Sequence, residues 1–314
     1  MKAWQFQNTH EPLVLTEIPE PTPGPGEVLI EMKAAGLCHS DVGMLEDEGW
    51  LVTLAKRPIT LGHENAGLVT AVGEGVTDIA VGDRVGLCPT TEAGAPGYVA
   101  DGGFQPKMVF PAIACVKIPE GVSWEQGAAA TDAGMTSHQA IIGKAQAGPG
   151  KKIGVIGFGG LGQIGARVAV LAGAEVYVAE VNEKVWDAAK EAGVKAVAKS
   201  IAEFKDVGLD AIVDYAGFGV TTAEAISTVA RGGTVVQVGM GRLEANISTR
   251  DLILSEVTLI GSQGGTKEDV AGVYEYLATG ELNPTLTKIT FDEIPEGLEK
   301  LHKGEVIGRL VAMY

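Results

Sequence analysis

A glycine-rich turn between an apolar strand and a helix constrains the fold of this chain more than any other segment. The run VIGFGGLG at 155–162 has the glycine spacing G-x-G-x-x-G and follows a predicted strand at 152–157. The residues at 160–172 have the apolar spacing of a helix. Strands and helices keep alternating up to residue 280. This alternation predicts parallel βαβ units in a doubly wound α/β sheet.

The rest of the chain has a different pattern, typical of short strands. Its apolar runs are separated by turns rich in glycine and proline, and they lie at 3–6, 14–18, 28–35, 66–72, 81–87 and 107–110. The segment PEPTPGPG at 19–26 cannot be helical, because proline disrupts a helix. We therefore expect an irregular, mainly β domain at 1–138, completed by 281–314, and a doubly wound domain at 139–280.

Further elements are predicted within these two domains. In the doubly wound domain we expect strands at 175–180, 194–198, 209–215, 234–239 and 257–262 and helices at 182–192, 222–230 and 267–279. In the last segment we expect strands at 286–291 and 307–312 on either side of a helix at 293–303.

Composition narrows the class of protein. Asp and Glu number 40 against 24 Lys and Arg, and this net charge of −16 argues against nucleic acid or an anionic membrane as a partner. Three widely spaced cysteines make no disulfide framework, which favours a reducing compartment. The N-terminal residues do not resemble a secretory signal, and the most apolar segment, 164–181, is interrupted by charges. We expect a soluble, cytoplasmic protein.

The glycine-rich turn predicts a dinucleotide site. In this pattern Gly157 allows the turn, Gly159 lets the backbone approach a pyrophosphate, and Gly162 allows the helix to pack closely on the strand. Gly160 and Leu161 complete the predicted loop. The phosphates are expected at the helix N-terminus, where free N–H groups and the helix dipole favour anions. The alternative is a glycine-rich turn that binds nothing.

Residues beyond the loop indicate which dinucleotide binds. Glu180 ends the second predicted strand, and an acid there can bond the ribose hydroxyls and repel a 2′-phosphate, which favours NAD over NADP. Lys184 is close enough to cover the adenine end, although a solvated helix lysine is an equal alternative. Val238, at the end of the strand 234–239, is a further predicted cofactor contact.

A second group of residues points to a metal. Cys38 lies in GLCHSD at 36–41, and His63 and Glu64 lie in GHE at 62–64. A thiolate, an imidazole and carboxylates near a hydroxyl are the parts of a catalytic zinc site, which takes three protein ligands and leaves one position open. A structural zinc site would use closely spaced cysteines, whereas Cys88 and Cys115 are isolated. Taken singly, Cys38 is equally well an inert buried thiol.

These residues resemble the zinc-dependent alcohol dehydrogenases of the medium-chain dehydrogenase/reductase superfamily. The resemblance runs nearly end to end, through PTPGPGEVLI, AAGLCHSDV, LGHENAGLVTAVGEGV, VGDRVG, TDAGMTSHQAI, GPGKKIGVIGFGGLGQIGARVA and GRLV in that order. It implies a GroES-like catalytic domain, an NAD-binding Rossmann domain, and hydride transfer between a secondary or primary alcohol and NAD. It also implies Cys38, His63 and Asp132 as ligands of one catalytic Zn²⁺. The aspartate is similar to that of a branch that acts on secondary alcohols.

The resemblance also implies roles for neighbouring residues. Glu64 is implied as a carboxylate that approaches the metal during ligand exchange, and Ser40 as the hydroxyl that bonds the substrate oxygen and begins a proton relay. His39 and Arg309 are implied as contacts of the cofactor pyrophosphate, and Thr136 as a neighbour of the nicotinamide. For Glu64, His39 and Arg309 the alternative is an ordinary surface side chain.

The chain departs from the family pattern at three points. Between 85 and 102 it has no four-cysteine lobe for a structural zinc, so we predict one zinc per chain; the loss leaves the packing of the expected homo-oligomer, a dimer or tetramer, open. Gly43 stands where many relatives have the last histidine of the relay, so the proton is expected to leave through the ribose hydroxyl and water. The segment FQPK at 104–107 also differs from the usual pattern, Gly-Tyr-Ala-Glu-Tyr.

Two rival functions remain open beside alcohol dehydrogenation. The first is a zinc-free quinone or enoyl reductase on the same fold; such relatives lack the cysteine and Gly-His-Glu ligands and prefer NADPH, which Glu180 disfavours. The second is a nucleotide-binding protein without catalysis, which the absent lobe and the glycine at position 43 leave possible.

Overall fold

The computed structural model describes all 314 residues and divides into two compact units. Met1–Ala133 and Thr266–Tyr314 form the first unit, and Gly134–Gly265 form the second. These limits differ from the expected ones at 138 and 280, because helix α8 (Lys267–Ala278) belongs to the first unit. One contact of α8 with the first unit is buried: the hydroxyl of Tyr274 donates to the carbonyl of Gly127 at 3.0 Å.

The first unit is built on a seven-stranded, mostly antiparallel sheet. Six strands follow the order β15-β16-β3-β5-β6-β8, and β7 pairs with β3. Their bounds are β3 (Glu27–Gly36), β5 (Glu64–Val72), β6 (Arg84–Leu87), β7 (Lys107–Pro111), β8 (Cys115–Lys117), β15 (Leu286–Thr290) and β16 (Arg309–Met313). A small sheet beside it contains β2 (Val14–Glu17), β1 (Lys2–Phe6) and β4 (Ile59–Thr60) in that order. In β3 buried and half-buried residues alternate, so that Val28, Ile30 and Met32 point into the core.

The first unit also contains short helices that the sequence pattern did not predict. The structure has α1 (His39–Glu46) and α2 (Trp124–Ala129), 3₁₀ turns at η1 (Glu48–Thr53) and η2 (Ala112–Ala114), and a π-helical turn η3 (Ala130–Gly134). Helix α1 has just eight residues and no clear apolar face, so hydrophobic spacing gives no sign of it. Near the C-terminus, η7 (Phe291–Glu293) and α9 (Ile294–His302) lie between β15 and β16.

The predicted strand at 81–87 begins three residues late, at Arg84. The preceding residues form a turn instead, in which the carboxylate of Asp83 accepts a hydrogen bond from the N–H of Ala80 at 2.9 Å. A side chain that bonds its own local backbone in this way favours a turn over a strand.

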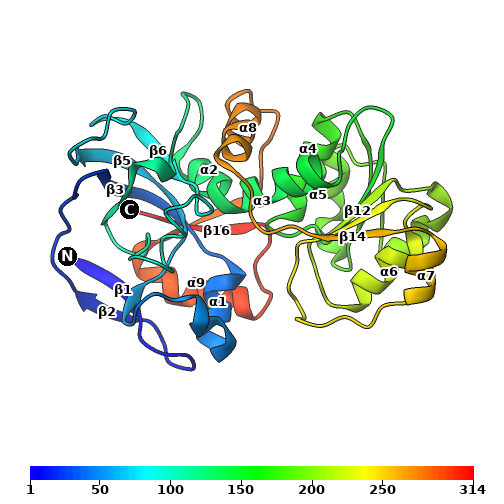
Figure 1. Ribbon diagram of the computed structural model, residues 1–314, viewed down its shortest axis with the longest axis horizontal. Helices are drawn as coiled ribbons and strands as arrows, with labels where there is room; N and C mark the ends of the chain where they lie inside the picture. The colour runs from blue at the N-terminus through cyan, green and yellow to red at the C-terminus, as the bar shows by residue number, and fades with distance from the viewer. The chain divides into compact units, whose positions relative to one another are not determined.

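The second unit is a doubly wound sheet of six parallel strands. The order is β11-β10-β9-β12-β13-β14, and the bounds are β9 (Lys152–Ile156), β10 (Glu175–Ala179), β11 (Ala196–Ala198), β12 (Ala211–Asp214), β13 (Thr234–Gln237) and β14 (Thr258–Gly261). The order reverses between β9 and β12, so the connecting helices fall on opposite faces. Figure 1 shows α4 (Gly162–Leu171) and α5 (Trp186–Glu191) on one face and α6 (Val220–Thr228) on the other. The predicted fold class, a Rossmann sheet plus a mainly β domain, is confirmed.

Several short helices of the second unit differ from the sequence-based expectations. The predicted helix at 182–192 is a 3₁₀ turn, η5 (Glu183–Val185), followed by α5. Four further helical segments had no prediction: α3 (Met135–His138), the π-helical η4 (Gln139–Lys144), the 3₁₀ segment η6 (Ile201–Val207) and α7 (Thr249–Leu254). All four segments are too short for a periodic pattern to identify them.

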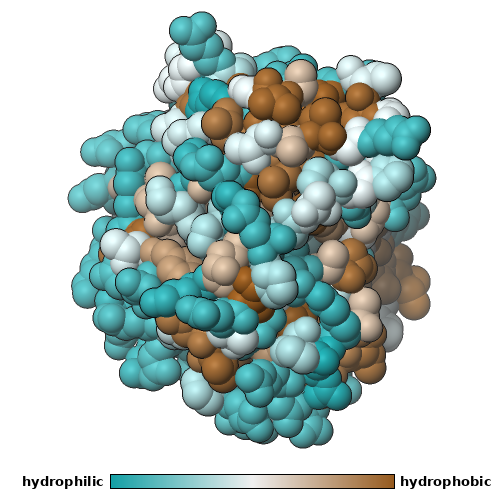
Figure 2. Space-filling view, turned by 90° about the vertical axis from the view of Figure 1, so that its left-hand side faces the viewer, coloured by the Kyte–Doolittle hydropathy of each residue, from teal (hydrophilic) through white to brown (hydrophobic).

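The face of the molecule in Figure 2 is largely hydrophilic, with apolar side chains gathered in patches toward its upper part. No helix of the chain combines the length and the apolar character that crossing a membrane requires.

Candidate metal centre and nucleotide loop

Strand pairing brings the two sequence motifs of the metal site together. Strands β3 and β5 are antiparallel, with Gly36 opposite Glu64. Cys38 follows the end of β3 and His63 precedes the start of β5, so the two side chains are neighbours. Asp132 comes from the π-helical turn η3. Such turns insert an extra residue into a helix and are frequent at functional sites.

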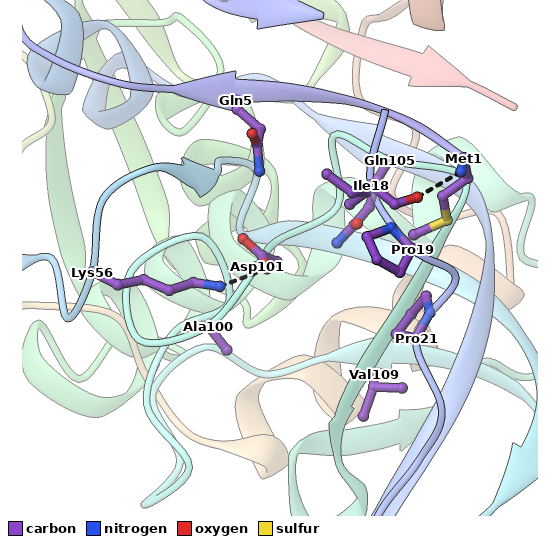
Figure 3. A pocket seen from close by; sticks show the side chains of 10 residues that line it. All are labelled: Met1, Gln5, Ile18, Pro19, Pro21, Lys56, Ala100, Asp101, Gln105 and Val109. Carbon is purple, nitrogen blue, oxygen red and sulfur yellow. Dashed lines mark hydrogen bonds and ion pairs between the residues drawn. The ribbon is translucent and has the colours of Figure 1, made fainter. Parts of the chain in front are cut away.

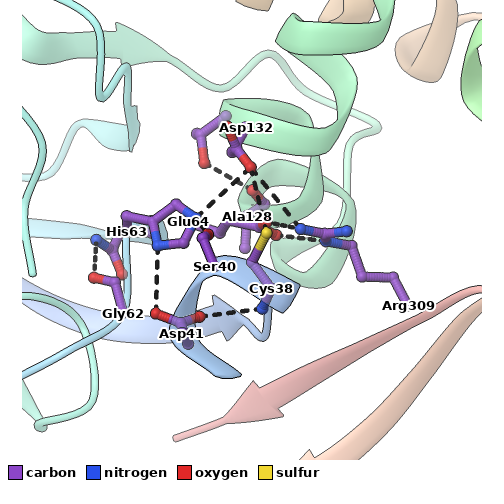
Figure 4. A network of polar contacts seen from close by, with 11 residues as sticks. Cys38, Ser40, Asp41, Gly62, His63, Glu64, Ala128, Asp132 and Arg309 are labelled. Carbon is purple, nitrogen blue, oxygen red and sulfur yellow. Dashed lines mark hydrogen bonds and ion pairs between the residues drawn. The ribbon is translucent and has the colours of Figure 1, made fainter. Parts of the chain in front are cut away.

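The donor atoms of these residues lie close enough to share one ion. The Sγ of Cys38 is 3.8 Å from Oδ2 of Asp132, and Nε2 of His63 is 3.6 Å from the same oxygen (Figure 4). One donor atom from each of these residues and from Glu64 lies within 4.8 Å of all the others. Ligand atoms around a tetrahedral zinc ion are about 3.3–3.6 Å apart, since the bonds measure about 2.0–2.3 Å. The donor set and its spacing therefore fit zinc after small shifts.

Asp41 is a residue of this site to which the sequence analysis gave no role. Its side chain is buried, and it lies on the first turn of α1. One carboxylate oxygen accepts a hydrogen bond from the N–H of Cys38 at 3.0 Å, and the other lies 3.3 Å from Nδ1 of His63 (Figure 4). A carboxylate on one ring nitrogen of a histidine fixes the tautomer that leaves the other nitrogen free for a metal. Asp41 thus orients two of the three candidate ligands.

Glu64 is buried and pairs with an arginine from the far end of the chain. Nε of Arg309, the first residue of β16, donates to Oε2 of Glu64 at 2.6 Å, and a second guanidinium nitrogen contacts the other oxygen. The same guanidinium lies 3.8 Å from Asp132. Gly36 makes room for this arrangement, because a Cβ there would lie 2.0 Å from the Glu64 carboxylate. Arg309 is therefore a buried partner of Glu64, and its contact with a pyrophosphate stays a prediction.

The charges around the site favour the thiolate form of Cys38 and the protonated form of His63. Burial raises the pKa of the Cys38 thiol. The positive charge of Arg309 and a hydrogen bond with His63 lower this pKa by more than burial raises it, so the net pKa shift is downward. Burial lowers the pKa of His63, but the nearby Asp41 carboxylate raises it, and the net pKa lies well above its usual value. Metal binding requires a thiolate and a neutral imidazole. A proton on His63 therefore competes with a metal ion in this site.

Two hydroxyl groups lie beside the ligands. The Oγ of Ser40 is 3.4 Å from Nε2 of His63, and its bond to a substrate oxygen stays a prediction. Tyr98, which the sequence analysis did not name, packs the edge of its ring against His63 with 5.6 Å between ring centroids. Burial raises the pKa of Tyr98 to about 12, so its phenol stays protonated. His39 is exposed, and packing around its ring together with the charge of Arg309 lowers its pKa.

The glycine loop has the geometry that its spacing predicts. Gly157 has a positive φ of 88°, which favours glycine at the turn. A Cβ on Gly162 would lie 1.9 Å from the carbonyl oxygen of Gly157, so the helix and the loop pack too closely for any side chain. A Cβ on Gly159 would meet nothing within 4 Å. The backbone at Gly159 therefore leaves room for a ligand, and its contact with a pyrophosphate stays a prediction.

Glu180 connects this loop to the end of β10. One carboxylate oxygen accepts from the N–H of Phe158 at 2.7 Å, and the other accepts from the N–H of Asn182 at 2.7 Å. The carboxylate is therefore fixed beside the loop. Lys184 is exposed, Val238 is half-buried at the end of β13, and Thr136 is buried on α3. Their contacts with a cofactor remain predictions, as do those of Gly160 and Leu161.

A pocket near the N-terminus does not belong to this site. It has a volume of about 350 Å³, and its lining residues are shown in Figure 3. The ammonium group of Lys56 pairs with Asp101 at 2.6 Å, and the N-terminal amine donates to the carbonyl of Ile18 at 2.7 Å. The lining includes no cysteine or histidine, so the pocket offers no metal-binding or nucleophilic group of that kind.

Comparison with known proteins places the chain in a family. Residues 24–120 match the model of the alcohol dehydrogenase GroES-like domain, and residues 160–279 match that of the zinc-binding dehydrogenases. An alcohol dehydrogenase of Geobacillus stearothermophilus is 31% identical over 342 aligned positions, which cover 99% of this chain and 98% of that protein. Since 342 positions exceed the 314 residues here, the relative contains residues that this chain lacks.

Two solved structures share the fold over the full length of the chain. Acetophenone reductase from Geotrichum candidum, solved in complex with NAD, has a TM-score of 0.90 at 28% identity and covers 100% of this chain and 97% of that one. A thermostable alcohol dehydrogenase from Pyrobaculum aerophilum, solved with cobalt and zinc bound, has a TM-score of 0.89 at 28% identity, with 100% and 99% covered.

A Rossmann unit joined to a GroES-like unit with a thiolate, imidazole and carboxylate cluster defines a zinc-binding dehydrogenase. The chain belongs to the alcohol dehydrogenase family of the medium-chain dehydrogenase/reductase superfamily. The predicted family and the predicted enzyme class, an alcohol oxidoreductase, are confirmed.

Proposed function

We propose that this protein is a zinc- and NAD-dependent alcohol dehydrogenase, which interconverts a secondary or primary alcohol and the corresponding ketone or aldehyde. The observation that carries the proposal is the cluster of Cys38, His63 and Asp132, whose donor atoms lie within 4.8 Å of one another. These residue types in this number are the ligands of a catalytic zinc that keeps an open position. The zinc-bound structure from Pyrobaculum aerophilum supports the choice of metal.

Zinc in this site would supply a Lewis acid, which lets an alcohol hydroxyl lose its proton near neutral pH. Cys38, His63 and Asp132 would bind the ion, and Asp41 keeps the first two of them oriented. Ser40 lies beside the Nε2 atom of His63, where its hydroxyl can take up the proton of the alcohol as it passes its own proton on to the ribose hydroxyl and water. Glu64, which Arg309 holds in place, offers a further carboxylate for the moments when ligands exchange.

NAD is the proposed cofactor, on the glycine loop of the second unit. Gly159 leaves the backbone open where a pyrophosphate would approach, and the loop leads into the N-terminus of α4. The Glu180 carboxylate beside the loop disfavours a 2′-phosphate. We expect Glu180→Ala to relax the preference for NAD over NADP. If kcat/KM for the two cofactors keeps its ratio, another residue decides the choice.

The test of the proposed function compares wild type with Cys38→Ser. The wild type should contain one zinc per chain and oxidise members of a panel of secondary and primary alcohols with NAD. Cys38→Ser should lose turnover while NADH binding, measured by fluorescence, stays nearly unchanged. Cys115→Ser is the matched control, because Cys115 is a buried cysteine of the same unit without a part in the cluster. Full activity of Cys38→Ser would exclude the zinc mechanism.

The two rival functions predict other results. A zinc-free quinone or enoyl reductase would contain less than half an equivalent of zinc and would reduce quinones with NADPH. A nucleotide-binding protein without catalysis would bind NADH and turn over no alcohol in the panel. The buried ligand cluster favours the dehydrogenase over both.

A homo-oligomer in a reducing compartment, the cytoplasm, completes the proposal. Strand β14 lies at the edge of its sheet and exposes Leu259, and the adjacent helix α7 exposes Ile253 and Leu254. An exposed apolar edge strand is a typical site for pairing with another chain. The three cysteines form no disulfide with one another, as a reducing compartment favours. Light scattering of the purified protein measures the number of chains, and a monomer at micromolar concentration would exclude the oligomer.

A further inference from the structure

A tyrosine outside the ligand motifs reaches the candidate metal centre. Tyr98 lies in the connection between β6 and β7, and its ring meets that of His63 edge-on, at an interplanar angle of 73°. Its hydroxyl lies near that of Ser40, close enough for a hydrogen bond between the two side chains. The Oγ of Ser40 is in turn 3.4 Å from Nε2 of His63. The three side chains therefore contact one another in a closed triangle.

The backbone around Tyr98 is fixed against the segment that contains His63. Gly97 has a φ of 81°, and a Cβ there would lie 3.0 Å from the nitrogen of Gly62. The carbonyl of Tyr98 accepts a hydrogen bond from Ala55 at 2.9 Å, and Gly103 donates to the carbonyl of Gly62 at 2.8 Å. The connection thus packs directly on the residue that precedes His63. The position of the Tyr98 ring relative to the ligand is set by these main-chain contacts.

Once His63 binds a metal, the hydroxyl of Ser40 depends on Tyr98 for a hydrogen-bonding partner. Nε2 of His63 is the ring nitrogen that faces both Ser40 and Asp132, whereas Nδ1 faces Asp41. A ring nitrogen that binds a metal has no lone pair left to accept a hydrogen bond. Tyr98 then remains as a side-chain partner that can fix the rotation of the Ser40 hydroxyl.

The next turn of α1 gives Ser40 no such support. Gly43, three residues further along the helix, has no side chain to offer. A Cβ at Gly43 would lie 2.8 Å from the indole of Trp50, so this ring covers this part of the helix. Tyr98, from another segment, provides Ser40 with a polar partner.

We propose that Tyr98 is a positioning residue, whose hydroxyl orients the hydroxyl of Ser40 toward the alcohol. The inference deepens the proposed function and rests on it, because Tyr98 acts through Ser40. A bond to the substrate oxygen matters most when that oxygen becomes negatively charged, so its orientation affects kcat more than KM.

Tyr98→Phe tests the proposal, because it keeps the ring against His63 and removes only the hydroxyl. We expect kcat for alcohol oxidation to fall about tenfold, as the loss of one oriented hydrogen bond predicts, with KM unchanged. Zinc content and melting temperature should equal those of the wild type. Tyr177→Phe is the matched control: it removes a hydroxyl that bonds Glu175 at 3.2 Å in the other unit, and it should change none of these quantities.

A double-mutant cycle with Ser40→Ala separates positioning from other roles. In the Ser40→Ala background, Tyr98→Phe should cause no further loss, because the residue through which it acts is gone. A crystal structure of zinc-loaded Tyr98→Phe should show Ser40 in more than one rotamer, against one in the wild type. This structural result does not depend on turnover.

Three results would overturn the inference: full kcat in Tyr98→Phe, an undiminished tenfold loss in the Ser40→Ala background, or a single wild-type rotamer of Ser40 in the variant structure. The proposed function fails by different results, namely no alcohol turnover or no zinc in the wild type. The rotamer measurement on wild type and Tyr98→Phe still decides the role of Tyr98 if turnover is absent.

Discussion

Replacing Asp41 by asparagine should weaken zinc binding through the tautomer of His63. The carboxylate now accepts from the N–H of Cys38 at 3.0 Å and faces Nδ1 of His63 at 3.3 Å. Asparagine has one acceptor oxygen, and the N–H of Cys38 requires it. The amide NH₂ would then donate to Nδ1 of His63, so that Nε2 would bear the proton. Nε2 is the nitrogen that faces Asp132, and a protonated nitrogen cannot bind a metal.

The expected loss is about 10–100-fold in zinc affinity, the usual effect of removing a residue that orients a ligand. This corresponds to about 1.4–2.7 kcal/mol. Competition with a chromophoric chelator at pH 7 measures the dissociation constant. Asp47→Asn is the control, since Asp47 lies at the end of the same helix and bonds only the N–H of Gly49, at 2.8 Å. A zinc affinity of Asp41→Asn within twofold of wild type would refute the reasoning.

Three further predictions concern the loop, the fold and pH. Gly162→Ala should weaken NADH binding at least tenfold in a fluorescence titration, because its Cβ would lie 1.9 Å from the backbone of the preceding loop. Asp214→Ala should lower the free energy of unfolding, measured in urea, by about 3–5 kcal/mol. The reason is that the buried carboxylate accepts four hydrogen bonds, two from main-chain N–H groups and two from threonine hydroxyls. A loss below about 1 kcal/mol would contradict this expectation. The pKa of His63 is raised in the folded, metal-free protein. The proton on His63 therefore stabilises the fold below the ordinary pKa of histidine, and this stability is lost as the pH rises through the raised pKa. Zinc affinity should rise over the same window, and calorimetry at pH 6 and pH 9 should show the larger zinc-induced gain in melting temperature at pH 9.

Local patterns allowed much of the fold and site to be predicted from the sequence. The glycine spacing, the strand before it and the acid at the end of the next strand all lie within about thirty residues, and each has a stereochemical reason that holds in any such fold. The positive φ of Gly157 and the close approach of Gly162 to the loop agree with the stereochemical reasons for the two glycines. Cys38 and His63 were identifiable because their short motifs are specific to a family.

Contacts between distant residues could not be predicted. The pairing of Glu64 with Arg309 joins residues 245 positions apart, and only the meeting of β3 with β5 and β16 brings them together. Tyr98 has no sequence pattern around it that marks a site residue. The limits of the two units depend on how α8 packs, and its buried contacts, such as that of Tyr274 with Gly127, are with residues far away in the sequence. Short helices such as α1 have too few residues for periodicity to identify them.

X-ray absorption at the zinc edge of the purified protein measures the ligand shell most directly. We expect one sulfur at about 2.3 Å with nitrogen and oxygen ligands at about 2.0–2.2 Å, and loss of the sulfur in Cys38→Ser. A shell without sulfur, a shell with two or more sulfurs, or an unchanged spectrum in Cys38→Ser would contradict this expectation.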